Sequence, residues 1–233
     1  MKTIAFIPVT EKSVHFFYET KNLTYSKPTI VQIYETVKKC KNIDEVYVCF
    51  EGKKLKKILN QYKIPSIQTS SFHKTGTDRI GEAVIKLKKK FDIILNIFSY
   101  NDNITPYQII ETVNFHKKNF NYDICIPFEK IKFSENQNQI KGVVNKKNEI
   151  LYLSRNKIPS ETTKRSKNFL VQSNIISFKF NGLMKFINLN QTKYELIENI
   201  ELLRAIENSI KIKSFIMNTN SYNKIYSRQK SFR

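Results

Sequence analysis

The sequence predicts an α/β protein built on a mostly parallel, doubly wound sheet with a small antiparallel insertion. Apolar, β-branched runs alternate with segments of helical periodicity through the first half of the chain, which is the element order of βαβ units. The chain has 233 residues, of which 40% are hydrophobic and 26% charged, so it is long enough to bury one large α/β core. Ligands of such sheets bind at the carboxyl ends of the strands.

The first half of the chain contains apolar runs typical of buried strands, interspersed with amphipathic segments typical of helices. The expected strands cover residues 2–8, 44–50, 92–99 and 122–128, and the expected helices cover residues 28–40, 52–62, 77–90 and 105–118. The strands end near residues 8–10, 50–53 and 98–102, and a ligand site is therefore expected there.

The second half of the chain has a different character, with strands that no long helix separates. The expected elements are strands at 148–154 and 174–180, a short helix at 182–188, a strongly patterned helix at 193–208 and a last strand at 211–217. We expect a single domain over residues 1–222, in which residues 130–180 form the inserted antiparallel part. A basic tail, residues 223–233, follows and is expected to be partly disordered.

The net charge of +20 arises from 40 Lys and Arg residues against 20 Asp and Glu, and 34 of the 40 are lysine. This balance predicts weak, salt-sensitive binding of polyanions. Arginine, which makes bidentate phosphate and base contacts, is scarce, and this argues against specific nucleic-acid recognition. A Lys-rich, Gly-poor composition also fits a coding bias toward A and T. With only five glycines, the chain contains neither a GxGxxG fingerprint nor a P-loop.

The cysteines and the N-terminus predict a cytoplasmic protein. Cys40, Cys49 and Cys125 are odd in number and far apart, a pattern that favours neither a disulfide framework nor a zinc site. The apolar run at the N-terminus, MKTIAFIPV, is too short for a membrane span or a signal-peptide core. It is better explained as a buried first strand.

Several motifs occur in a fixed order along the chain. They are FIPVT at 6–10, HKTGTDRIGEA at 73–83, LNIFSYNDNITP at 95–106, QIKGVVNKKNEILYLSRNKIP at 139–159, NIISFKF at 174–180 and YELIENIELLRAIEN at 194–208. With these motifs the chain resembles, from end to end, the CMP-Kdo synthetase (3-deoxy-manno-octulosonate cytidylyltransferase) family. GTDR and LYLSR…IP are the most specific of them.

The resemblance implies a nucleotide-diphospho-sugar-transferase fold and a homodimer built partly on the inserted hairpin and the late acidic helix. It also implies CTP and a 2-keto sugar acid as substrates, Mg²⁺ as cofactor and a place in lipopolysaccharide biosynthesis. In the implied reaction, the anomeric hydroxyl of the eight-carbon sugar acid attacks the α-phosphate of CTP, and pyrophosphate leaves.

The same resemblance implies roles for particular residues. The nucleotide would be bound by Pro8, Lys21, Gly76, Thr77, Asp78 and Arg79. The sugar acid would be bound by Ser154, Arg155, Glu198 and Glu201. Lys21 would be the catalytic residue on the triphosphate, and Asp102 is the candidate catalytic and metal-binding residue if the loop shifts its register.

The motifs that carry the family's chemistry are altered in this chain. Tyr100 and Asn218 occupy the positions of the two metal-binding aspartates, and Asp102 is either a replacement for one of them or an ordinary exposed turn residue. Thr10 and Phe17 replace the two arginines of the phosphate-binding loop. The sequence therefore predicts a family member whose activity is weak, altered or lost. The alternatives are an active cytidylyltransferase for another acidic sugar and a non-catalytic basic binding protein on the same fold.

Overall fold

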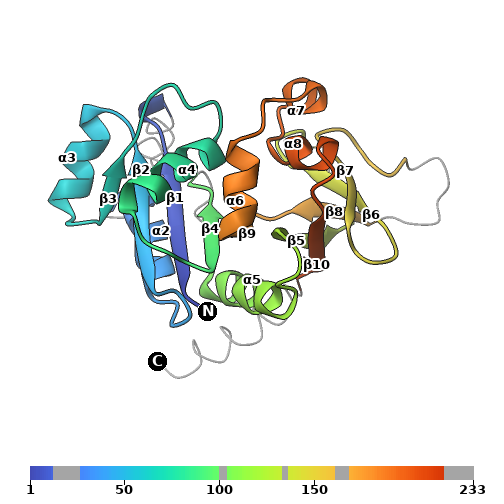
Figure 1. The fold of residues 1–233 in the computed structure, drawn as a ribbon, viewed down its shortest axis with the longest axis horizontal. Helices are drawn as coiled ribbons and strands as arrows, with labels where there is room; N and C mark the ends of the chain where they lie inside the picture. The colour runs from blue at the N-terminus through green and yellow to red at the C-terminus, as the bar shows by residue number, and fades with distance from the viewer. Residues whose placement is uncertain (13–26, 100–103, 133–135, 161–167, 218–233) are drawn as a thin grey trace. The chain divides into compact units, whose positions relative to one another are not determined.

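The computed structural model describes residues 1–12, 27–99, 104–132, 136–160 and 168–217 (Figure 1). The chain divides into two compact units, one formed by Met1–Cys125 with Asn174–Asn190 and the other by Ile126–Ser173 with Gln191–Arg233. The second unit therefore includes most of the predicted insertion at 130–180 together with the C-terminal segments. The single domain over residues 1–222 stays a prediction, and the tail at 223–233 lies outside the described residues.

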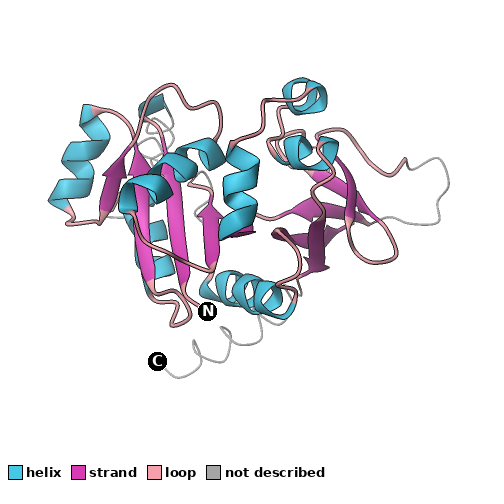
Figure 2. Ribbon diagram, viewed as in Figure 1, coloured by secondary structure: helices cyan, strands magenta, loops and turns pink. Residues whose placement is uncertain are grey.

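The sheet of the first unit has the strand order β3-β2-β1-β4-β9. Its strands are β1 (Thr3–Val9), β2 (Glu45–Phe50), β3 (Ser66–Gln68), β4 (Ile93–Ile97) and β9 (Ile175–Lys179). The pairings β1–β2, β2–β3 and β1–β4 are parallel, and β4 pairs with β9 antiparallel. The carboxyl ends of β1, β2 and β4 consequently meet at one edge of the sheet, and the predicted α/β class is confirmed (Figure 2).

The helices of the first unit fall into two groups, one for each face of this sheet. They are α2 (Thr29–Lys38), α3 (Lys53–Gln61), α4 (Gly76–Leu87), α5 (Pro106–Lys118) and α6 (Phe180–Ile187). Helix α2 contacts α5, and α4 contacts α6 (Figure 1). Alternate strand residues serve the two faces, because Ala5 and Ile7 join the core on the α2 side whereas Asn96 bonds to Thr77 of α4.

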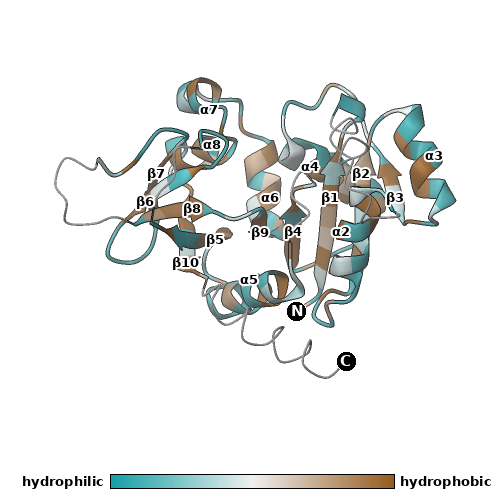
Figure 3. Ribbon diagram, turned by 180° about the vertical axis from the view of Figure 1, so that it is seen from behind, coloured by the Kyte–Doolittle hydropathy of each residue, from teal (hydrophilic) through white to brown (hydrophobic). Residues whose placement is uncertain are grey.

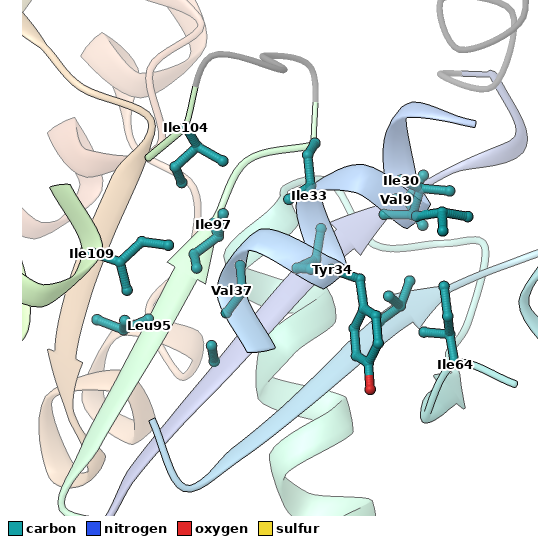
Figure 4. Close-up of a cluster of buried hydrophobic side chains, with 14 of the residues drawn as sticks. Val9, Ile30, Ile33, Tyr34, Val37, Ile64, Leu95, Ile97, Ile104 and Ile109 are labelled. Carbon is teal, nitrogen blue, oxygen red and sulfur yellow. The ribbon is translucent and has the colours of Figure 1, made fainter. Parts of the chain in front are cut away.

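The core between α2, α5 and the sheet is made almost entirely of aliphatic side chains. Figure 4 shows Ile33 and Val37 of α2 over the strands, and Ile109 of α5 near Leu95 of β4. Each of these four side chains is at most 1% exposed. Burying one such side chain stabilises a fold by about 1.5–3 kcal/mol, so this cluster fixes β1 and β4 and thereby the strand ends where the site lies.

Helix α3 explains the lysine-rich run at residues 53–57. Leu55 and Leu59 are fully buried, while the lysines between and before them are exposed. Figure 3 shows the resulting alternation of hydrophobic and hydrophilic residues around α3. This run is therefore the solvated face of an amphipathic helix, as the sequence predicts.

The second unit is an antiparallel sheet with two short helices. β5 (Ile124–Ile131) begins in the first unit and continues into the second, where the order is β5-β8-β6-β7 and β10 pairs with β5. The remaining elements are β6 (Lys141–Val144), β7 (Ile150–Ser154), β8 (Phe169–Gln172), β10 (Ile212–Ile216), α7 (Lys193–Glu198) and α8 (Leu202–Glu207). The predicted antiparallel character of this region is confirmed by the β5–β8, β8–β6 and β6–β7 pairings.

The single helix predicted over 193–208 is wrong, because the structure divides it into α7 and α8. Asn199 closes α7 in the left-handed region, with φ of 52°, and the chain turns before α8 starts at Leu202. Asparagine tolerates this conformation better than most residues, so it ends a helix that periodicity alone would continue. The short strands β3, β6 and β8 were not expected either, since runs of three or four residues carry little periodic signal.

Cys40, Cys49 and Cys125 all belong to the first unit, where each is buried and carries a free thiol. Burial raises the pKa of the Cys40 thiol to about 11 and that of Cys49 well above its ordinary value. Over the described part of the chain, no helix combines the length and the apolarity needed to cross a bilayer.

Candidate functional site

A pocket of about 270 Å³ lies at the carboxyl ends of β1 and β4. Its walls are residues 8–10 after β1, residues 73–76 at the start of α4, Arg79 within that helix, and residues 98–99 after β4. The Ser99 hydroxyl donates to the Pro8 carbonyl at 2.9 Å and so ties the two strand ends together. This is the edge of a parallel sheet at which ligands bind, and it is the place that the sequence predicts.

The amino end of α4 forms one wall of the pocket. Thr75 caps the helix, since its hydroxyl oxygen accepts from the Asp78 N–H at 3.1 Å and donates to the Asp78 carboxylate at 2.8 Å. A side chain at Gly76 would place its Cβ 3.2 Å from Cγ of Pro8, so glycine allows α4 to approach the end of β1 closely. Helix amino ends attract anions through their N–H groups and their dipole, so this wall suits a phosphate.

Thr77 and Asp78 of the GTDR motif make hydrogen bonds to other residues of the protein. Thr77 is fully buried and its hydroxyl accepts from the Asn96 side-chain amide at 3.0 Å, which fixes α4 to β4. Asp78 completes the cap with Thr75. Of the motif residues predicted to bind the nucleotide, Gly76 and Arg79 line the pocket, as does Pro8, whereas Thr77 and Asp78 support its wall from within.

Arg79 lies beneath the pocket with only 3% of its surface exposed. Its Nη1 donates to the Thr69 hydroxyl at 2.6 Å and to the Ser70 carbonyl at 3.0 Å. Burial lowers the pKa of Arg79, although neighbouring Glu51 opposes this effect, and a guanidinium remains a cation in proteins. Arg79 thus holds the segment before α4 in place and adds positive charge to the pocket.

Glu82 of α4 holds His73 in place just before the start of α4. Its carboxylate accepts from the Nε2 of His73, from the Ser70 N–H at 2.8 Å and from the Lys86 ammonium at 2.6 Å. Burial raises the pKa of Glu82, but the bonds from Lys86, His73 and Ser70 outweigh it and lower this pKa to about 2. Glu82 is therefore a carboxylate near neutral pH, and a carboxylate accepts only, so Nε2 of His73 must carry a proton.

Magnesium does not fit the walls of the pocket that the structure describes. The ionisable side chains among the lining residues are His73, Lys74 and Arg79, and none of the described lining residues is Asp or Glu. Mg²⁺ prefers carboxylate oxygens, whereas these cationic groups suit the phosphates themselves. The catalytic candidates Lys21 and Asp102 lie outside the described residues.

The residues predicted to bind the sugar acid lie in the second unit, where three of them form one hydrogen-bonded cluster. The Glu198 carboxylate accepts from the Ser154 hydroxyl at 2.8 Å and from the Arg155 N–H at 3.0 Å. The Arg155 guanidinium donates back to the carbonyls of Glu198 and Asn199, at 3.0 and 2.9 Å. The fourth residue, Glu201, is half-buried directly before α8. Arg155 is thus engaged with the carboxyl end of α7.

Lys141 strengthens the same region through three backbone carbonyls. Although it is only 1% exposed, its ammonium donates to the carbonyls of Asn136, Gln139 and Arg155 at 2.8, 3.0 and 2.7 Å. Burial lowers the pKa of Lys141, and the nearby Arg155 and Lys157 charges lower it further. Three carbonyl acceptors match the three donors of an ammonium, so Lys141 stabilises the backbone conformation around Arg155.

A buried ion pair connects α7 with α8. Arg204 donates through Nε and Nη2 to the two carboxylate oxygens of Glu195, at 2.9 and 2.6 Å. The two side chains are 2% and 3% exposed. Glu195 also accepts from the Thr192 N–H at 3.2 Å, at the start of α7. The sequence marks Glu195 and Arg204 only as charged positions of one helix, and their pairing depends on the turn at Asn199.

Comparison with known proteins gives the same family for most of the chain. A family model described as cytidylyltransferase matches residues 20–212. The 3-deoxy-manno-octulosonate cytidylyltransferase of Thermodesulfovibrio yellowstonii is 32% identical, over 95% of this chain and 92% of that protein. The enzyme of the same name from Parabacteroides distasonis is 31% identical, over 91% of this chain and 89% of that protein.

A solved structure shows that the fold is shared as well. The structure of CMP:2-keto-3-deoxy-manno-octonic acid synthetase complexed with CTP aligns with a TM-score of 0.80 over the whole of both chains, at 21% sequence identity.

Proposed function

The chain belongs to the cytidylyltransferase family and is CMP-Kdo synthetase-like. From this premise we propose that it binds CTP in the pocket at the ends of β1 and β4 but transfers the cytidylyl group weakly or not at all. The observation that carries the proposal is the composition of that pocket. Its described walls combine a helix amino end with His73, Lys74 and Arg79, a set of groups that attracts phosphates.

Weak transfer follows from what the reaction needs. The sugar hydroxyl must attack the α-phosphate while charge builds up on the phosphate oxygens, so catalysis depends on positioning and on charge stabilisation. Tyr100 and Asn218 stand where the resemblance places metal-binding aspartates, and neither is an anionic ligand. Losing a single charge-stabilising contact can lower a rate by ~10²–10³.

We expect CTP to bind the purified protein at least about tenfold more tightly than GTP, which is the discrimination that ~1.4 kcal/mol provides. Calorimetric titration of both nucleotides, with and without Mg²⁺, measures this. Pyrophosphate release from CTP and Kdo is expected to be slower by ~10²–10³ than with the Thermodesulfovibrio relative. Equal and salt-sensitive binding of CTP and GTP would instead favour the basic polyanion-binding alternative, and a rate equal to that of the relative would refute the loss of activity.

A pair of double variants tests whether the missing metal-binding carboxylates limit the activity. Tyr100→Asp combined with Asn218→Asp returns the two carboxylates, and Mg²⁺-dependent pyrophosphate release should then rise at least about tenfold. Tyr100→Phe with Asn218→Gln is the matched control, because it changes the same positions without adding charge. If both double variants behave like the unmodified protein, the missing carboxylates are not the reason for low activity.

A second candidate function is transfer of the cytidylyl group to another acidic sugar. It is favoured by the hydrogen bonds that Arg155 makes within the protein. Its Nε and Nη2 donate to the protein's own carbonyls at 3.0 and 2.9 Å, which leaves less of the guanidinium for the carboxylate of a sugar. Asn174 and Leu202 also stand where the resemblance places a histidine and a glutamine. Pyrophosphate release with a panel of 2-keto sugar acids tests this candidate, and silence with the whole panel counts against it.

We also propose a homodimer that uses the exposed apolar face of α7. Tyr194, Leu196 and Ile197 are 44%, 63% and 66% exposed, a concentration of apolar surface typical of an interface. Leu196→Glu is expected to shift the mass measured by light scattering from dimer to monomer without lowering the melting temperature of the monomer. Lys193→Glu, on the same helix, is the matched control and should stay dimeric. A monomeric unmodified protein at micromolar concentration would contradict this proposal.

A further inference from the structure

Among the described ionisable residues that line the pocket, His73 is the one that bonds to a carboxylate. It lines the pocket from the segment just before α4, and Glu82, one helix turn beyond Arg79, bonds to its Nε2. The side chains of His73 and Glu82 are 21% and 23% exposed, so the pair is largely shielded from solvent. The opposite ring nitrogen, Nδ1, makes no hydrogen bond to any residue that the structure describes.

We propose that the His73–Glu82 pair acts as a charged phosphate clamp, in which the His73 imidazolium donates its Nδ1 proton to a phosphate oxygen of the bound nucleotide. The inference rests on the proposed binding of CTP and names a residue that determines it. Glu82 is a positioning residue in this scheme, because it reaches the phosphate only through His73. No covalent bond forms or breaks, and the proton stays shared between Nδ1 and the phosphate oxygen.

The chemistry of the pair supports this role. A carboxylate that accepts from one ring nitrogen fixes the ring orientation and stabilises the positive charge that a second proton brings. Glu82 can do this because it stays ionised, with a pKa of about 2. A hydrogen bond between an imidazolium and a phosphate oxygen is charge-assisted, and such bonds are roughly twice as strong as neutral ones.

The charged groups that the structure places around His73 come from α4 and from the segment before it. Glu82 bonds to the ring, and Arg79 and the adjacent Lys74 line the same pocket. Lys86 contacts the other carboxylate oxygen of Glu82. The described lining residues from the ends of β1 and β4 are uncharged. Bringing a phosphate into the pocket then favours the protonated ring, so CTP should bind more tightly as the pH falls.

The test is calorimetric titration of CTP without metal at pH 8 and pH 6, for the unmodified protein and for three variants. We expect His73→Gln to weaken binding about tenfold at pH 6 and to remove most of the tightening between pH 8 and pH 6. Glu82→Gln should weaken binding at pH 6 less than His73→Gln does and should lose part of the tightening. Lys89→Gln also removes a positive charge near α4, but Lys89 pairs with Glu45 outside the pocket, and this matched control should behave like the unmodified protein.

The outcomes separate the clamp from the function on which it rests. If the unmodified protein does not bind CTP, the proposed function fails. If it binds and His73→Gln binds equally at both pH values, or if Lys89→Gln loses as much, only the clamp is overturned. Should a variant unfold, the unmodified protein decides the matter through the ¹⁵N resonances of its His73 ring at saturating CTP. A protonated Nδ1 supports the clamp, and an unprotonated Nδ1 refutes it.

Discussion

Arg204→Met is expected to lower the free energy of unfolding by about 3–5 kcal/mol. The substitution leaves the Glu195 carboxylate, which is 3% exposed, without the guanidinium that donates to both of its oxygens. An unpaired buried charge costs far more than the removal of both charges together. Urea denaturation followed by circular dichroism at neutral pH measures the change.

Two further variants show whether the lost charge partner is the cause. Glu195→Leu combined with Arg204→Met removes both charges, and it should recover most of the stability that Arg204→Met loses. Lys185→Met breaks the exposed pair between Lys185 and Asp123, and it should leave the urea midpoint nearly unchanged. A loss below about 1 kcal/mol in Arg204→Met would mean that Glu195 finds another partner or takes up a proton.

Acidification is expected to destabilise the protein through His116. This side chain is fully buried, with Nδ1 on the Ser177 hydroxyl at 2.6 Å and Nε2 on the Tyr122 carbonyl at 3.2 Å. Burial lowers the pKa of His116 from its ordinary 6.5 to about 4, and the nearby Lys179 charge acts in the same direction. Between these two values the unfolded chain binds a proton that the folded protein excludes.

The sign and size follow from this difference in proton binding. Because the pKa is lower in the folded state, the stability is fully present above pH 6.5 and falls as the pH drops toward 4. The loss should reach about 2 kcal/mol at pH 5 and about 3 kcal/mol near pH 4. His116→Gln should lack this component, so unfolding curves of both proteins at pH 7.5 and pH 5 isolate it. Parallel losses in the two proteins would assign the effect to other groups.

Most of the fold could be predicted because its strands are buried on both faces. Runs such as that around Ile4 and Ile7 are apolar at every position, and they lie between helices with a clear apolar stripe. The second unit was harder to predict, because short strands such as Phe169–Gln172 carry little pattern. The break at Asn199 depends on a single left-handed residue, which leaves the helical periodicity on both sides unchanged.

The place of the pocket could be predicted, but the contacts of its side chains could not. Strand order places the ends of β1 and β4 together, and Gly76 is the position where α4 must approach β1. The pairing of His73 with Glu82 depends on how the segment before α4 folds back onto the helix. The same holds for Arg155, whose donors are engaged by the carbonyls at the end of α7. Such contacts between loops and helices have no periodic signal in the sequence.

The buried thiols make it possible to measure whether the two units unfold together. All three cysteines belong to the first unit, and Cys40 and Cys49 lie away from its boundary in β5, so a thiol reagent that reaches these two records the opening of that unit. The Glu195–Arg204 pair belongs to the second unit, so Arg204→Met weakens a part of the chain that contains no cysteine. If the thiols of this variant react at a lower urea concentration, the two units unfold as one; if they react as before, each unit unfolds on its own.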